Sequence, residues 1–209
     1  EEPGGMLRYG IPRYRLPTHI LDKELNRVKD LGVEFKYNIN LGEDITLSQI
    51  RKIYKAVYLA VGAQSSVSLK MEEENFSNSF TGIDFLKSIA KGQLPNIGRL
   101  VTVIGGGNVA IDTARSALRY GATTVTIVCL EQRYEMPAWD TEIKEAIKEG
   151  IKIINGYGPY KIISTNAHIT KVIFKRCISV FDPDGHFNPS YDENDQIGID
   201  TDSLIVAIG

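Results

Sequence analysis

Cysteine, tryptophan and methionine are scarce in this chain, with 2, 1 and 3 residues among 209. The two cysteines, Cys129 and Cys177, form neither a disulfide framework nor an iron–sulfur or zinc ligand set. An excess of one charge is also lacking, because 24 basic and 26 acidic residues leave a formal net charge of −2. No basic stripe is present, which excludes nucleic acid as an expected partner. The apolar runs are too short to cross a bilayer, so no membrane partner is expected. The two cysteines, with no disulfide framework, favour a reducing cytoplasm.

A glycine cluster lies between two apolar runs in the middle of the chain. Gly105, Gly106 and Gly107 follow the first run, Ala110 completes the spacing G-x-G-x-x-A, and a helical segment leads to the second run. This order of strand, glycine turn, helix and strand is typical of the first half of a dinucleotide-binding fold. There the first glycine permits a tight turn, the second lets the backbone approach a pyrophosphate, and the alanine permits close helix–strand packing. The alternative is a tight turn that holds no ligand.

The start of the helix after these glycines is suited to an anion. Its first N–H groups have no acceptor within the helix, and the positive end of the helix dipole lies there. Asp112, five residues beyond Gly107, has two open interpretations. It either orients the glycine loop or is a solvated acid that complements the dipole.

Hydrophobic periodicity and capping residues predict the remaining elements. Helices are expected over 19–31, 46–54, 81–90 and 140–149. Strands are expected over 33–37, 56–61, 151–154 and 204–209, and apolar runs within 160–181 predict an antiparallel meander. Residues 182–185 have the composition of a turn, and 182–200 as a whole are expected to be a loop. Strands that alternate with helices indicate an α/β protein with a central parallel sheet.

Five segments match a known family in order and spacing. They are PGGMLRYGIPRYRLP (3–17), YLAVGA (58–63), VIGGGNVAID (103–112), EMPA (135–138) and LIVAIG (204–209). With them, essentially all of the chain resembles the small (beta) subunit of glutamate synthase and its relatives, including the flavin–nicotinamide portion of dihydropyrimidine dehydrogenase. In that family a nicotinamide domain is inserted in a flavin domain. The resemblance implies that 1–62 are a partial FAD-domain segment, that 63–209 are a Rossmann-like NAD(P)-binding domain, and that the chain is a fragment of a longer protein.

The resemblance also implies cofactor-binding positions. The pyrophosphate of the dinucleotide is expected at Gly105, Gly106, Gly107, Asn108 and Val109, the nicotinamide half beside Ala207, Ile208 and Gly209, and FAD at Met6 and Arg15. The implied reaction is hydride transfer from NAD(P)H to FAD, which passes electrons to an iron–sulfur domain or a larger partner subunit. FAD is expected only in the full-length protein. Because the redox chemistry belongs to the cofactors, no catalytic acid, base or nucleophile is expected, and no metal ligand.

Two other functions compete with this electron-input module. One is a non-catalytic NAD(P)-binding or sensing domain that has lost its flavin, and the other is an interaction scaffold that binds no nucleotide. A second G-x-G-x-x-G unit upstream in the gene would favour the flavin enzyme over the sensing domain, whereas the scaffold predicts no affinity for a dinucleotide.

Glu131 and Arg133 bear on the choice between NADH and NADPH. NADPH-using members of the family carry two adjacent basic residues after the second strand, and another a little further on, to hold the 2′-phosphate. Here Leu130 and Glu131 stand at the adjacent positions, and only Arg133 is kept. A carboxylate repels a phosphate but accepts hydrogen bonds from a ribose hydroxyl. The sequence therefore favours NADH, while Arg133 leaves room for some NADPH binding. The alternative is that Glu131 is merely solvated.

Overall fold

The computed structural model describes residues 2–63, 65–69, 71 and 76–208. Contacts divide the chain into two units, Glu1–Ser65 and Ser66–Gly209. The predicted assignment of 1–62 to a flavin domain and of 63–209 to a nicotinamide domain concerns function as well as folding, and it stays a prediction.

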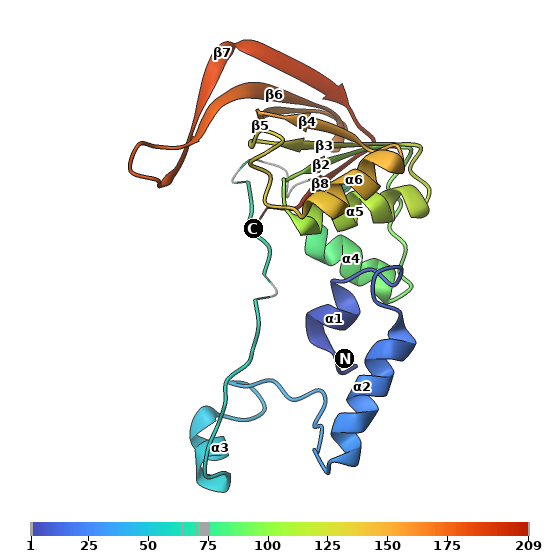
Figure 1. Cartoon of the computed structure of the whole chain (residues 1–209), viewed down its shortest axis with the longest axis vertical. Coiled ribbons are helices and arrows are strands. Elements are labelled where there is room, and N and C mark those ends of the chain that lie inside the picture. The colour runs from blue at the N-terminus through green and yellow to red at the C-terminus, as the bar shows by residue number, and fades with distance from the viewer. Residues whose placement is uncertain (1, 64, 70, 72–75, 209) are drawn as a thin grey trace. The chain divides into compact units, whose positions relative to one another are not determined.

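The first unit contains the short helix α1 (Gly5–Tyr9) and the helices α2 (Thr18–Asp30) and α3 (Leu47–Ile53) (Figure 1). The predicted capping box is present at the start of α3. The hydroxyl oxygen of Thr46 accepts the N–H of Gln49 at 3.3 Å, and the side-chain oxygen of Gln49 accepts the N–H of Thr46 at 2.8 Å. The helices expected over 19–31 and 46–54 are therefore confirmed.

The strands predicted over 33–37 and 56–61 are wrong. Both segments are irregular, and the described part of this unit contains only an isolated bridge between Leu41 and Ile45. Their apolar side chains lie open to solvent, with Tyr58 92% and Val61 71% exposed. A β-strand forms only when its N–H and C=O groups pair with a neighbouring strand. An apolar sequence pattern indicates that a segment is able to form a strand, but it does not indicate whether a partner strand is available.

The second unit is built on a parallel sheet of five strands, in the order β1-β8-β2-β3-β4 (Figure 1). The strands are β1 (Ser79–Thr81), β2 (Leu100–Ile104), β3 (Thr124–Cys129), β4 (Lys152–Asn155) and β8 (Ser203–Val206). Strand β3 confirms the strand predicted for the apolar run that follows the glycine unit. Strands β4 and β8 confirm the strands predicted at 151–154 and near 204–209. Their strongly apolar composition fits strands that are covered on both faces.

Helices cover one face of this sheet. They are α4 (Gly82–Ala90), α5 (Asn108–Arg119) and α6 (Asp140–Lys148), which confirm the expected helices (Figure 1). The hydroxyl of Thr81 accepts the N–H of Asp84 at 3.2 Å and so caps α4. One core lies between the sheet and these helices and includes fully buried Val103 and Ile127.

An antiparallel sheet covers the other face. It contains β5 (Tyr157–Thr165), β6 (His168–Phe181) and β7 (Phe187–Asp200), in the order β5-β6-β7. A second core joins it to the parallel sheet, with Val172 and Phe174 of β6 fully buried. The meander is confirmed, and so is the turn, where the N–H of Gly185 donates to the carbonyl of Asp182 at 3.0 Å.

The loop expected over 182–200 is wrong beyond the turn, because residues 187–200 form β7. This strand pairs with β6 through register shifts near Lys175 and Arg176, most of its residues are polar, and none of its residues is fully buried. Only a few apolar residues, among them Ile197 and Ile199, pack on the second core. An edge strand with one mostly solvated face and an irregular register has little periodicity to detect. Within the described residues, no helix has the length and apolar character needed to span a membrane.

A partly buried ion network ties α5 to α6. Arg115, whose side chain is 9% exposed, contacts Glu142 at 2.8 Å and Glu149 at 2.7 Å, and Arg119 reaches Glu149 at 2.7 Å. The hydrogen bond from Arg119, followed by that from Arg115, lowers the pKa of Glu149 to about 2, against the opposing effect of burial.

We expect Glu149→Gln to lower the free energy of unfolding by about 2 kcal/mol near neutral pH, because it leaves Arg115 buried with less compensation. A carboxyl whose pKa is depressed on folding stabilises the protein above its unfolded pKa, and that stability is lost as the pH falls through the folded pKa. The difference between wild type and variant should therefore shrink below about pH 4.5 and vanish only below about pH 2. Urea denaturation across this range measures it. Glu145→Gln, on the exposed side of the same helix, is the control; an equal loss there would contradict the network's role.

Candidate dinucleotide-binding site

The carboxyl ends of β8, β2 and β3 meet at one edge of the parallel sheet. The chain leaves β2 through the glycine turn and α5 and returns to β3 on one side, while β8 lies on the other side of β2. Backbone bonds fix this edge, because the N–H of Gly105 donates to Val128 at 2.9 Å and that of Ala207 to Ile104 at 2.8 Å. Open α/β sheets bind ligands at such a reversal of strand order.

Gly105 cannot be replaced by a larger residue without a change in the turn. Its φ is +139°, in the region that favours glycine, and a Cβ there would lie 2.3 Å from the carbonyl oxygen of Ala207. The same Cβ would be 3.4 Å from that of the fully buried Ala110. The tight turn and the close approach of helix to strand therefore have the geometry that the spacing predicts.

Gly107 faces open space. It is the residue that precedes α5, its backbone is extended with φ −91° and ψ 176°, and a Cβ there would meet nothing within 4 Å. The N–H groups of the first turn of α5 point out of the helix at this place. Donor groups beside an uncovered backbone are what a pyrophosphate requires, so the residues present fit that group.

Glu131 lies against the glycine turn. A Cβ on Gly106 would be 2.7 Å from the Oε2 atom of Glu131. The backbone of this residue is fixed, because its carbonyl accepts the N–H of Gly156 at 3.1 Å and the side-chain amide of Asn155 at 3.1 Å. Glu131 is only partly exposed.

Arg133 is engaged elsewhere. Its guanidinium contacts the carboxylate of Asp140 at 2.5 Å, at the start of α6. Lys144 contacts the same carboxylate at 2.6 Å, and hydrogen bonds from Lys144 and then Arg133 lower the pKa of Asp140. This ion pair is exposed to solvent.

The other predicted positions lie around the turn or in the first unit. Asn108 and Val109 begin α5, and the side-chain oxygen of Asn108 accepts the N–H of Trp139 at 3.0 Å. Ala207 is buried and Ile208 half-buried just after β8, while Gly209 lies outside the described residues.

The positions predicted to touch FAD belong to the first unit. Met6 is half-buried in α1, and Arg15 is exposed in the turn before α2. The described residues of that unit contain no parallel sheet with a glycine turn, so they do not by themselves form a flavin site.

Asp112 is 5% exposed, so its interpretation as a solvated acid is wrong. Its buried position one turn inside α5 fits an orienting role behind the glycine loop.

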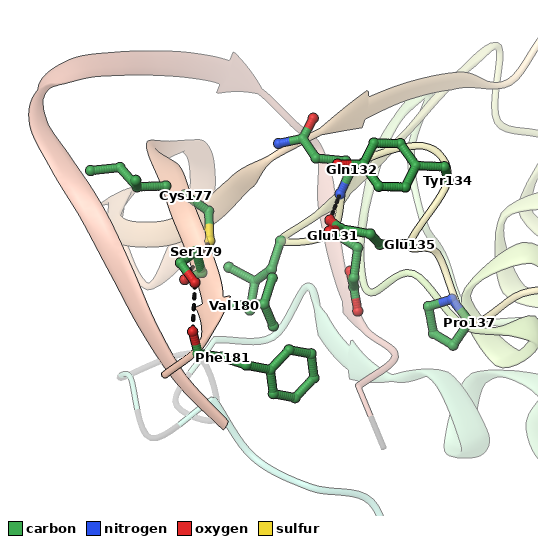
Figure 2. Close-up of a pocket in the computed structure, with 11 residues that line it drawn as sticks. Glu131, Gln132, Tyr134, Glu135, Pro137, Cys177, Ser179, Val180 and Phe181 are labelled. Atoms are coloured by element: carbon green, nitrogen blue, oxygen red, sulfur yellow. Dashed lines mark hydrogen bonds between the residues drawn. The ribbon is translucent and has the colours of Figure 1, made fainter. Parts of the chain in front are cut away.

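A pocket that the sequence did not predict adjoins Glu131 (Figure 2). Its volume is about 350 Å³, and its walls are the loop after β3 and the last residues of β6. It is lined by Leu130, Glu131, Gln132, Tyr134, Glu135, Pro137, Cys177, Ile178, Ser179, Val180 and Phe181. Burial raises the pKa of the Cys177 thiol, with nearby Glu131 as the second cause. No motif marks residues 177–181, because they reach the site only through the folding of the antiparallel sheet.

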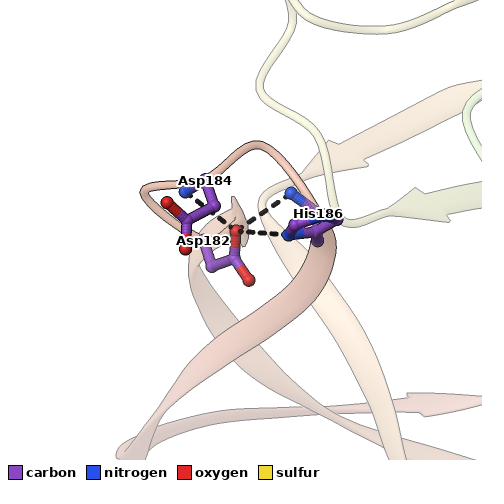
Figure 3. Close-up of side chains that lie close together, drawn as sticks. All are labelled: Asp182, Asp184 and His186. Carbon is purple, nitrogen blue, oxygen red and sulfur yellow. Dashed lines mark hydrogen bonds and ion pairs between the residues drawn. The ribbon is translucent and has the colours of Figure 1, made fainter.

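Three side chains of the kinds that bind metals meet at the turn between β6 and β7 (Figure 3). They are Asp182, Asp184 and His186, and the last two are exposed. The turn itself accounts for their positions, because the Oδ1 atom of Asp182 accepts the N–H of Asp184 at 3.0 Å and that of His186 at 2.9 Å.

A parallel sheet with a glycine turn, an open backbone at the helix start and an acid at the next strand defines the class of dinucleotide-binding α/β proteins. The sequence model of the pyridine nucleotide-disulphide oxidoreductase family matches residues 16–209, and the chain belongs to this family.

Individual relatives agree with the resemblance found in the sequence. The NAD-dependent dihydropyrimidine dehydrogenase subunit PreT of Escherichia coli is 37% identical over 77% of this chain and 39% of its own length. The glutamate synthase [NADPH] small chain of Azospirillum brasilense is 29% identical over 99% of this chain and 45% of its own length. The resemblance is thus confirmed.

Among solved structures, FprA of Mycobacterium tuberculosis in complex with NADPH has a TM-score of 0.80 at 18% identity, covering 99% of this chain and 61% of that one. This likeness confirms the α/β fold alone. The chain spans from 21% to 45% of the length of the curated relatives that it matches.

Proposed function

We propose that this chain binds NAD(P)H at the glycine turn and is the electron-input module of a flavin-dependent oxidoreductase. The observation that carries the proposal is the open backbone of Gly107 at the start of α5, with the carboxylate of Glu131 against the same turn. An anion and an adjacent ribose are the two groups that this combination suits. Membership of the pyridine nucleotide-disulphide oxidoreductase family supports it.

Each residue contributes binding rather than chemistry. The backbone N–H groups that follow Gly107 hold the pyrophosphate, and Glu131 accepts a hydrogen bond from a ribose hydroxyl. Ala207 and Ile208 lie beside the nicotinamide half, on the β8 side of the turn. The reduced nicotinamide supplies a hydride, which a flavin of the whole protein accepts. The role of this chain is to orient the donor.

The final electron acceptor lies beyond this chain. The PreT relative is called a subunit and the glutamate synthase relative a small chain, so both work with other polypeptides. We propose an iron–sulfur domain or a larger partner subunit as the recipient of the electrons.

A non-catalytic NAD(P)-binding or sensing domain is the second candidate. The described residues of the first unit form no glycine turn of the flavin-binding kind, and both candidates predict this for the present chain. The flavin enzyme predicts that the full gene encodes a second G-x-G-x-x-G unit upstream, and the sensing domain predicts that it does not.

We expect the purified 209-residue chain to bind NADH in calorimetry and to carry no stoichiometric flavin. It has one complete glycine fingerprint, and Met6 and Arg15 do not replace a second pyrophosphate turn. Without a hydride acceptor it should not reduce a dye with NADH or NADPH, whereas a protein extended to the full reading frame should gain both flavin and dye reduction. Flavin absorbance at one equivalent in the chain alone would contradict the flavin assignment. Failure to bind either dinucleotide would overturn the proposed function.

A further inference from the structure

The pocket beside Glu131 has two walls from distant parts of the sequence. One wall is the loop that follows β3, and the other is the end of β6, residues 177–181 (Figure 2). Consecutive backbone bonds hold the walls together. The N–H of Gly156 donates to the carbonyl of Glu131 at 3.1 Å, and the N–H of Cys177 donates to the carbonyl of Gly156 at 2.8 Å. The backbone therefore joins the two walls of the pocket. Glu131 also lies against the glycine turn, since its Oε2 atom would be 2.7 Å from a Cβ on Gly106.

The strand order determines which half of a dinucleotide reaches this pocket. Ala207 follows β8 and Glu131 follows β3, and these strands flank β2 on opposite sides. A dinucleotide whose pyrophosphate lies at the turn after β2 extends one nucleoside toward each side. The pocket is on the β3 side, away from Ala207 and Ile208. At about 350 Å³ it is near the lower limit for ligand sites, which suits one nucleoside better than a whole dinucleotide.

The lining is chemically asymmetric. Glu131 provides a carboxylate next to the glycine turn and Gln132 provides a side-chain amide, whereas Val180 and Phe181 provide an apolar surface on the β6 wall (Figure 2). None of the described residues that line the pocket is basic. The ring of Phe181 is 55% exposed and is supported by Phe187 of β7, with an edge-to-face arrangement and 6.3 Å between ring centres. A flat, uncharged ring is the group that such a wall accommodates.

We propose that the end of β6, through Phe181, is the element of this protein that recognises the adenine base. The inference rests on the proposed function, since it assigns the adenosine half of the same dinucleotide. It gives the antiparallel sheet a part in binding, in addition to its part in the second core. It also makes Phe181 a specificity-determining residue that no glycine motif indicates.

The test is Phe181→Ala, measured by calorimetry with three probes. NADH and ADP-ribose both carry adenosine and should bind about tenfold more weakly, a typical effect of removing an aromatic ring that contacts a base. Reduced nicotinamide mononucleotide lacks adenosine, and its affinity should stay within about twofold of wild type. Phe181→Tyr keeps the ring and should retain the affinity for all three. Ile163→Ala, on the exposed surface of β5, is the matched control for a lost apolar side chain.

Failure of this inference is distinguishable from failure of the proposed function. If wild type binds NADH and Phe181→Ala binds NADH and ADP-ribose equally well, the adenine assignment is overturned while the site remains. An equal loss for the mononucleotide would show that the substitution disturbs the whole site, and would also overturn it. If wild type binds neither NADH nor NADPH, both proposals fall.

Discussion

Gly107→Val is expected to abolish dinucleotide binding and to leave the fold intact. The backbone at this residue is extended, and a new Cβ would meet nothing within 4 Å, so valine fits the protein. The side chain would instead occupy the space that a pyrophosphate needs in order to reach the first N–H groups of α5. Losing charge-assisted hydrogen bonds costs about 1.5–3 kcal/mol each, so we expect affinity for NADH to fall at least about 100-fold. Calorimetry measures the affinity, and urea denaturation shows that stability is retained.

Gly105→Val is the contrasting variant. Its Cβ would lie 2.3 Å from the carbonyl oxygen of Ala207, at a φ of +139°. Both strain and overlap act on the folded state, and we expect a loss of about 3 kcal/mol or more in the free energy of unfolding. The pair separates binding from folding within one turn. Normal NADH binding by a folded Gly107→Val protein would refute the assignment of this loop.

The glycine unit could be predicted from the sequence because its parts are local. The turn at Gly105, the open backbone at Gly107 and the small residue Ala110 lie within a few positions of one another, and each has a steric reason for its type. The capping residues Thr46 and Thr81 are local in the same sense. Each bonds to a backbone N–H within its own helix, so a short pattern determines where the helix begins.

The features that sequence analysis missed depend on distant partners. The segments 33–37 and 56–61 have the composition of strands, but the described residues of their unit pair no strand with them. The opposite is true of β7. Its polar composition does not predict a strand, but pairing with β6 and packing on the second core stabilise one there. The pocket wall that includes Phe181 is joined to Glu131 by backbone hydrogen bonds through Gly156, which is distant from β6 in the sequence. In each case the local structure depends on contacts with residues that are distant in the sequence. Hydrophobic periodicity within the segment gives no information about those contacts.

Wild type is expected to bind NADH more tightly than NADPH, by about tenfold. The carboxylate of Glu131 lies against the glycine turn, where it would accept a hydrogen bond from a ribose hydroxyl and would repel a 2′-phosphate. No described residue in the pocket lining offsets that charge with a basic group, and Arg133 is paired with Asp140. The names of the relatives include both an NAD-dependent and an NADPH-dependent protein, so family membership alone does not determine the preference.

Glu131→Gln should remove most of this preference, because it removes the repulsion and weakens the bond to the ribose. NADH affinity is expected to fall several-fold and NADPH affinity to rise, until the two differ by less than about threefold. Glu135→Gln is the matched control. Glu135 lines the same pocket, but its carboxylate accepts the N–H of Gln132 at 3.0 Å and so serves the loop. Titration of NADH and NADPH into wild type and both variants measures the two affinities and so tests the predicted preference. If wild type binds NADPH clearly more tightly, Glu131 does not face the ribose in the complex, and Arg133 leaves Asp140 to hold the phosphate.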